Sequence, residues 1–297
     1  MSRFHFIDSE RAHYPVNLLC RLLRVSRSGF YAWSSRPPSA RAVADEVLTE
    51  QIRSFHLASR CTYGAPRIND DLRDAGVHVG TKRVARLMRN AGIEGVHRRS
   101  WRHATKQNPA AAPAPDLLDR DFTATGPNQK LVADVTYVPT VAGWLYLAIV
   151  MDVFSRRVIG WSIDTHRKTQ LVCDAVAMAI ANRAGNLDGV IHHSDRGGEY
   201  TSRDLELALR RAGMLASMGS VADCYDNSMA ESFFATLETE LFWAQPLRRF
   251  ESHRDAKMAI FDYIEVFYNR QRRHTAIGSI PPVTFETRYA AQTGVAA

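Results

Sequence analysis

The stretch Leu131-Val132-Ala133-Asp134-Val135-Thr136-Tyr137-Val138 decides the fold expected of this sequence. Apolar residues at successive positions are typical of a strand that is buried on both faces, as in the centre of an α/β sheet. Asp134 stands inside this run, where a carboxylate costs free energy unless it is paired or binds a metal ion. The structural alternative is an acid on an edge strand, and the valines argue against it. Asp134 is therefore the first candidate functional residue.

Two more carboxylates stand beside apolar runs. Asp195 ends Val190-Ile191-His192-His193-Ser194-Asp195, and Glu231 opens Glu231-Ser232-Phe233-Phe234-Ala235-Thr236-Leu237, with 35 residues between the two acids. Hard divalent ions prefer oxygen ligands, and two such ions held by carboxylates promote phosphoryl transfer. Each acid also has a structural alternative: Asp195 could shape a turn with the glycines that follow it, and Ser228-Met229-Ala230-Glu231 fits a helix capping box. The apolar stripe beside Glu231 favours an orientation toward the sheet.

The words around the three acids resemble a known family. Ala133-Asp134-Val135-Thr136-Tyr137 and the segments 193–202 and 226–234 are similar to the catalytic boxes of bacterial insertion-sequence transposases of the OrfB type, within the DDE transposase and retroviral integrase superfamily. Near the C-terminus, Tyr268-Asn269 with Arg272, His274, Ile277 and Pro281-Pro282 resembles the tail motif of that group. The resemblance extends from about residue 24 to residue 285. It departs from the family pattern at Glu238, where many relatives carry Lys or Arg.

The resemblance implies an α/β fold, with a ribonuclease-H-like mixed-sheet catalytic core preceded by an all-α helix-turn-helix region. It implies that Asp134, Asp195 and Glu231 are catalytic and hold two Mg²⁺ (or Mn²⁺) ions. These ions would serve cleavage at insertion-sequence ends and strand transfer by a 3′-OH into target DNA. The implied partners are double-stranded DNA, an OrfA protein or OrfA–OrfB fusion, and further copies of the chain on DNA.

Patterns along the chain predict five segments: a short helical segment 1–36, a basic helix-turn-helix-like DNA-binding domain 37–106, a linker 107–127 rich in Pro and Ala, an integrase-type catalytic core 128–245 and a helical tail 246–297. In the core, hydrophobic patterns predict strands at 130–139, 144–151, 157–164, 189–195 and 214–218. Helices are expected at about 168–183, 202–212 and 227–242.

Positive charge is concentrated in the second segment. The chain carries a net charge of +7, and residues 60–106 hold eleven Lys or Arg against four Asp or Glu. Such a concentration attracts a polyanion, so DNA or RNA is the expected partner. The predicted DNA-binding residues are Lys82, Arg83, Arg86, Arg89, Arg98, Arg99 and Arg102. A solvated basic helix face is the alternative for the first four.

Two residues of the tail, Arg272 and His274, are possible DNA contacts, with a surface salt bridge as the alternative. The four cysteines lie far apart, which indicates neither a disulfide framework nor a CxxC zinc site. No apolar run is long enough to span a bilayer and no signal pattern is present, so we expect a cytoplasmic protein. The resemblance implies that it is bacterial and acts on the nucleoid.

Two other functions remain open at this level. A chain without OrfA could bind DNA as a regulator, or be an inactive relic of transposition. A ribonuclease H acting on RNA–DNA hybrids would use a similar carboxylate site, although the tail motif and the basic segment favour transposition. Metal-dependent nicking of DNA that contains element ends separates a transposase from a regulator.

Overall fold

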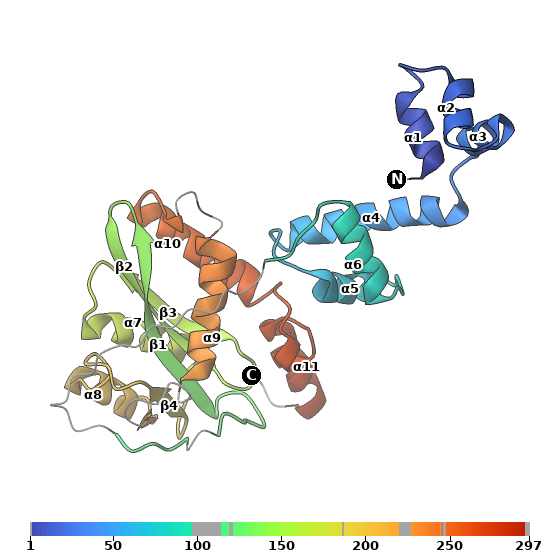
Figure 1. Cartoon of the computed structure of the whole chain (residues 1–297). Coiled ribbons are helices and arrows are strands. Elements are labelled where there is room, and N and C mark those ends of the chain that lie inside the picture. Colours follow the sequence, from blue (N-terminus) through green and yellow to red (C-terminus); the bar gives the residue numbers. More distant parts are fainter. Residues whose placement is uncertain are drawn as a thin grey trace.

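A computed structural model describes residues 2–96, 114–118, 121–185, 187–219, 227–243, 245 and 248–294 (Figure 1). Its centre is a five-stranded sheet in the order β3-β2-β1-β4-β5. The strands are β1 (Lys130–Thr140), β2 (Gly143–Asp152), β3 (Val158–Asp164), β4 (Ile191–Ser194) and β5 (Leu215–Met218). Strand β1 pairs antiparallel with β2 and parallel with β4. The sheet is therefore mixed, which confirms the expected fold class.

Alternate side chains of β1 pack in two separate hydrophobic clusters, one on each face of the sheet. Leu131, Ala133 and Val135 pack in a cluster with helices α7 (Thr169–Asn182) and α8 (Arg203–Arg211). Val132 and Val138 point to the opposite face and pack in a cluster with α9 (Ser228–Leu237) and the C-terminal helices. Because side chains alternate along a strand, Asp134 shares this second face. The buried central strand predicted from the valines is confirmed.

The C-terminal helices cover the face of the sheet that carries Asp134. Helix α9 continues as the π-helix η1 (Glu238–Phe242), and α10 (His253–Phe261) continues as the π-helical segment η3 (Asp262–Tyr268). A short 3₁₀ turn, η4 (Thr275–Ile277), leads to α11 (Pro282–Thr293). Glu286 of α11 is buried and accepts hydrogen bonds from Arg183, Arg157 and Ser155. This network joins the last helix to the sheet domain.

The region before the sheet is helical (Figure 1). Three short helices, α1 (Arg3–Glu10), α2 (Val16–Leu22) and α3 (Arg27–Ser34), share a small cluster of buried side chains. Helices α4 (Ala40–Ala58), α5 (Ala65–Asp74) and α6 (Thr81–Asn90) follow, and apolar side chains of all three pack together. The break between α5 and α6 falls at Gly76, whose φ is +80°. This is the expected helix-turn-helix arrangement.

The helix-turn-helix region contacts the C-terminal segment. Arg273 donates hydrogen bonds to Asp71 at 2.6 Å and Asp74 at 2.5 Å, and its backbone N–H donates to the Tyr63 hydroxyl at 2.6 Å. The described residues between α6 and β1, namely 91–96, 114–118 and 121–129, form neither helix nor strand, while 107–113 and 119–120 of the expected linker lie outside the described residues. The segment boundaries stay a prediction. None of the described helices is both long and apolar enough to cross a membrane.

Candidate active site

Two of the three candidate carboxylates come from neighbouring parallel strands. Ala133 of β1 lies opposite Ser194 of β4, and each is followed directly by an aspartate. Asp134 and Asp195 are therefore the next residues on two adjacent strands. The Asp134 carboxylate accepts a hydrogen bond from the Val135 N–H at 2.7 Å, and Asp195 accepts one from the Gly197 N–H at 2.9 Å. The sheet thus brings together two acids that lie 61 positions apart in the sequence.

The third carboxylate arrives on α9, which is fastened to β1 beside Asp134. The Asn227 side-chain amide donates to the backbone carbonyl of Ala133 at 3.2 Å. Asn227 is also the N-cap residue, so Ser228 is already helical and the capping box considered for Glu231 is not formed. Glu231 is exposed, so the expectation that it turns away from solvent was wrong. The apolar neighbours on α9 are buried, and Glu231 lies at the margin of that stripe.

The charges of the three acids act on one another. Burial, together with the negative charges of Asp195 and Glu231, raises the pKa of Asp134 from its ordinary value to about 8. Burial and the Glu199 carboxylate raise the pKa of Asp195. Carboxylates held this close repel one another in the folded chain. Such a site has a net negative charge that a cation would offset.

An arginine that the sequence reasoning missed lies beside these acids. Arg167 forms an ion pair with Glu199, and its Nη1 donates to the Tyr137 hydroxyl at 3.3 Å. Its positive charge acts to lower the pKa of both Asp134 and Asp195. Arg167 follows β3, which runs parallel to β1, so the topology alone places it at the same edge of the sheet. That is the signal by which it could have been found.

Two residues that follow Asp195 in the chain shape the surroundings of the site. A Cβ atom added to Gly197 would lie 3.0 Å from the Asp195 Oδ1 and 3.1 Å from the Glu199 Oε2. The Tyr200 side chain is buried, and its hydroxyl has no hydrogen-bond partner in the part of the chain that the structure describes. Burial, and then the charges of Asp134 and Asp195, raise the pKa of this hydroxyl well above its usual range. Tyr200 therefore places an uncharged polar atom close to the acids.

The donor chemistry of this site suits a hard divalent ion, because its three acids offer only carboxylate oxygens. In the described ranges, however, no three Asp, Glu, His or Cys side chains are already gathered as a metal site. Asp134 and Asp195 have the required proximity in the sheet, whereas Glu231 is exposed on its helix. The ligand type and the negative charge of these residues suit a divalent cation. The Glu231 side chain would have to move to bind the same cation as Asp134 and Asp195.

The predicted DNA-binding residues of α6 fall into two groups. Lys82 and Arg89 are exposed. Arg83 and Arg86 are partly buried and both bind Asp45 of α4, with donor–acceptor distances of 2.8 and 2.7 Å. The other predicted residues, Arg98, Arg99 and Arg102, lie outside the described residues.

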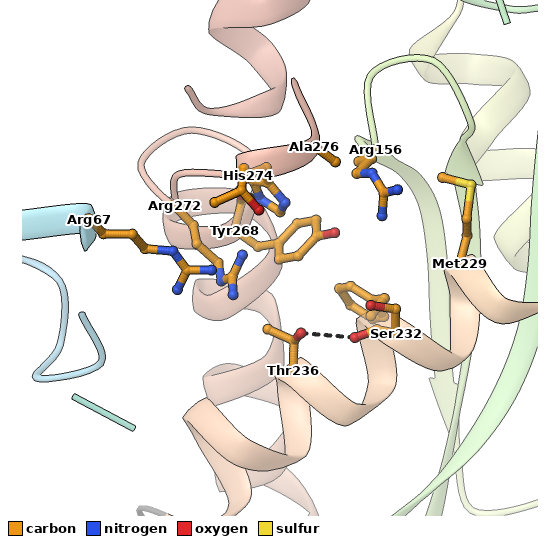
Figure 2. A pocket seen from close by; sticks show the side chains of 11 residues that line it. Arg67, Arg156, Met229, Ser232, Thr236, Tyr268, Arg272, His274 and Ala276 are labelled. Atoms are coloured by element: carbon orange, nitrogen blue, oxygen red, sulfur yellow. Dashed lines mark hydrogen bonds between the residues drawn. The ribbon is translucent and has the colours of Figure 1, made fainter. Parts of the chain in front are cut away.

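The tail residues Arg272 and His274 are buried, and Figure 2 shows them from close by. Arg272 donates two hydrogen bonds to the Glu240 carboxylate at 2.8 and 2.7 Å. His274 packs edge-on against the Tyr268 ring, with 4.6 Å between ring centroids. Arg272 therefore forms a buried ion pair and not the surface salt bridge considered from the sequence. A DNA contact by either residue stays a prediction.

The chain matches three family models. Residues 124–224 and 231–289 each match an integrase core domain, and residues 43–101 match an HTH-like domain. Transposase InsF for insertion sequence IS3A of Escherichia coli (strain K12) is 38% identical over 288 residues, which cover 96% of this chain and 99% of that protein. The 31 kDa protein of insertion element IS600 of Shigella sonnei is 38% identical over 91% of this chain and 98% of its own length.

Among solved structures, the simian T-cell lymphotropic virus intasome in complex with PP2A regulatory subunit B56 gamma aligns with 79% of this chain and 74% of its own, at 15% identity and a TM-score of 0.45. The sequence relatives carry the assignment by themselves. The resemblance found in the three catalytic boxes is confirmed by identity that extends along almost the whole chain. This protein belongs to the family of insertion-sequence transposases that carry an integrase core domain.

Proposed function

We propose that this transposase cleaves DNA at the ends of an insertion sequence and joins the resulting 3′-OH to target DNA, with Asp134, Asp195 and Glu231 as the ligands of two Mg²⁺ or Mn²⁺ ions. One observation carries the proposal: Asp134 and Asp195 follow paired residues on adjacent strands, and the charges of Asp195 and Glu231 help to raise the pKa of Asp134. Arg167 is the cationic side chain beside these acids, and its guanidinium forms its ion pair with Glu199.

The surrounding residues position the three carboxylates that would bind the two metal ions. When bound, the two ions would activate the attacking oxygen and stabilise the leaving oxygen of the phosphodiester. Asp134 and Asp195 are held by the sheet and by hydrogen bonds from the backbone. Glu231 is exposed in the first turn of α9, and the proposal requires its carboxylate to turn toward the aspartates when metal binds. Arg167 and Glu199 form an ion pair, and the charges of both act on Asp195.

The remaining parts of the proposal concern DNA and partners. The HTH-like domain would bind duplex DNA through Lys82 and Arg89 together with further basic residues of the segment 60–106. We expect the active assembly to contain several copies of the chain on two DNA ends, joined to an OrfA protein or fused with it. The protein would act in the bacterial cytoplasm, on the nucleoid, where its DNA substrate lies.

The test is cleavage and joining of a labelled duplex that carries the ends of the insertion sequence encoding this chain. The protein alone and fused to OrfA would be incubated with Mg²⁺, with Mn²⁺ or with EDTA. We expect nicks that leave a 3′-OH, and joined products, only with metal. Glu231→Gln and Asp134→Asn should abolish both products, whereas Glu206→Gln on the exposed face of α8 removes the same charge and should leave both unchanged.

Binding of the duplex without metal-dependent nicks, in the chain alone and in the fusion, would contradict the proposal and favour a DNA-binding regulator. Loss of products in Glu206→Gln would show that the assay responds to charge in general. A preference for cleaving the RNA strand of an RNA–DNA hybrid over the duplex would point to a ribonuclease H.

A further inference from the structure

A polar cavity is lined in part by Ser232, the residue that follows Glu231 on α9 (Figure 2). Its volume is about 130 Å³. Three arginines line it from three parts of the chain: Arg67 from α5, Arg156 from the turn between β2 and β3, and Arg272 from the C-terminal segment. Ser232 and Thr236 of α9, with Tyr268 and His274, add hydroxyl and imidazole groups. We call this cavity the arginine pocket.

The arginine pocket has more positive charge than the protein neutralises. No acidic residue is among the described residues that line it. The nearby Glu240 carboxylate binds Arg272 through two hydrogen bonds and lies 3.7 Å from the Arg67 Nη1, so one negative charge faces two guanidinium groups. The Arg156 side chain has neither an ion pair nor a hydrogen bond within the described ranges. At least one cationic group is therefore available to an anion.

The lowered pKa of His274 is consistent with an excess of positive charge in the arginine pocket. Burial, and then the charges of Arg272, Arg67 and Arg156, hold the pKa of His274 well below its usual range. The imidazole is therefore neutral near pH 7 and adds no charge of its own. Arg272 and His274 are nearly buried, which keeps water from screening the arginines fully.

We propose that the arginine pocket binds a backbone phosphate of the DNA substrate. Guanidinium groups match phosphate oxygens in geometry and charge, and hydroxyl groups such as that of Ser232 are common additional donors to DNA phosphates. The pocket joins α5 of the HTH-like domain to α9 of the catalytic core. A phosphate held there connects the domain that binds DNA with the helix that carries Glu231. This inference rests on the proposed DNA substrate and adds a specific contact to it.

The experiment measures duplex affinity by fluorescence anisotropy in EDTA, with the full chain, over a series of salt concentrations. Arg156→Gln should weaken binding about tenfold, the loss expected for one charged hydrogen-bonded contact. It should also reduce the slope of log K against log salt by ~0.9, the value for one phosphate contact. Arg156→Lys keeps the charge and should restore part of the affinity. The matched control is Arg210→Gln on α8, which removes an exposed arginine that does not line the pocket.

Ser232→Asp provides an independent variant, because it places a negative charge in the pocket without removing an arginine. It should weaken DNA binding at least as much as Arg156→Gln, while thermal melts confirm that both variants fold. Inorganic phosphate should raise the Tm of the wild type more than that of Arg156→Gln. Equal affinities and equal salt slopes for Arg156→Gln and Arg210→Gln would overturn the inference. Stabilisation by inorganic phosphate without any effect on DNA affinity would also overturn it, since the pocket would then hold only a free anion.

The outcome is independent of the catalytic proposal, because the binding assay needs neither metal nor cleavage. If the wild type nicks DNA with metal and Arg156→Gln binds DNA as tightly as the wild type, the proposed function stands and the phosphate-binding role of the arginine pocket is refuted. A reduced salt slope in Arg156→Gln, in a chain that does not nick DNA, would support the pocket alone.

Discussion

The side chain of Asn269 binds both backbone polar groups of Val158. Its Oδ1 accepts from the Val158 N–H at 3.0 Å, and its Nδ2 donates to the Val158 carbonyl at 2.9 Å. Val158 begins β3, an edge strand of the sheet, and both residues are buried. The amide side chain thus continues the hydrogen bonding of the strand and fixes the C-terminal segment to the sheet.

Asn269→Ala should lower the free energy of unfolding by about 2–4 kcal/mol, because two buried backbone groups lose their partners and each costs about 1–3 kcal/mol when unsatisfied. Urea denaturation followed by circular dichroism measures the change. Asn90→Ala, at the exposed end of α6, is the matched control and should change stability by less than about 0.5 kcal/mol. Equal stability of the two variants would show that Asn269 does not anchor the tail.

Two adjacent glycines allow a sharp test of the surroundings of Asp195. A Cβ at Gly197 would press on the carboxylates of Asp195 and Glu199, whereas a Cβ at Gly198 would meet no atom within 4 Å. Gly197→Ala should therefore displace Asp195 and reduce the nicking rate at least about tenfold, with the size set by how far the carboxylate moves. Gly198→Ala should retain the wild-type rate. Similar rates for both variants would show that the position of Asp195 tolerates this displacement.

The raised pKa of Asp134 predicts how the metal-free protein responds to pH. Its pKa is about 8 in the folded chain against an ordinary 3.8, so the folded state binds the proton more tightly than the unfolded state. Stability is then greatest at low pH with respect to this group, and falls as the pH rises from about 4 toward 8. In EDTA, the Tm of the wild type should be lower at pH 8.5 than at pH 6.

Asp134→Asn removes this titration, and should raise the Tm at pH 8.5 by several degrees while abolishing nicking. Mg²⁺ should raise the Tm of the wild type at pH 8.5 and have a smaller effect on the variant. A lower Tm of Asp134→Asn at both pH values would contradict the assignment of Asp134 as a carboxylate that is costly for the fold.

Much of the sheet and the positions of two of the proposed catalytic acids follow from local patterns. A strand that is buried on both faces is typically a nearly continuous apolar run, so the valines around Asp134 mark β1 without knowledge of its neighbours. Each predicted strand and helix of the core matches an observed element to within a few residues. Asp195 could be placed because the polar end of a short apolar run marks the end of β4.

The apolar pattern of α9 did not predict the orientation of Glu231 correctly. It follows buried Ala230, and a rotation of about 100° per helical residue leaves the next position at the margin of the stripe. Contacts between distant residues were equally hidden. Arg167 and Glu199 lie 32 positions apart, and Arg272 finds Glu240 at the same separation. The sequence does not reveal whether a given arginine will form a buried ion pair with an acid far away in the chain.

The pair formed by Asp45 with Arg83 and Arg86 leads to a prediction about DNA binding. In the free protein, this carboxylate occupies both guanidinium groups. Asp45→Asn weakens that hold, so both arginines become more available to phosphates. Duplex affinity in EDTA should rise, and the salt slope should become steeper by up to ~0.9 for each additional phosphate that an arginine binds.

Glu46→Gln is the matched control for Asp45→Asn, since it removes the same charge one residue later on the exposed surface of α4. If α6 contacts DNA, Asp45→Asn should raise duplex affinity more than Glu46→Gln does, because Asp45 is the acid that binds the two arginines. If both variants raise affinity equally, the gain comes from net charge alone and α6 is a solvated basic face. In that case Lys82→Gln and Arg89→Gln should also leave duplex affinity within about twofold of the wild type.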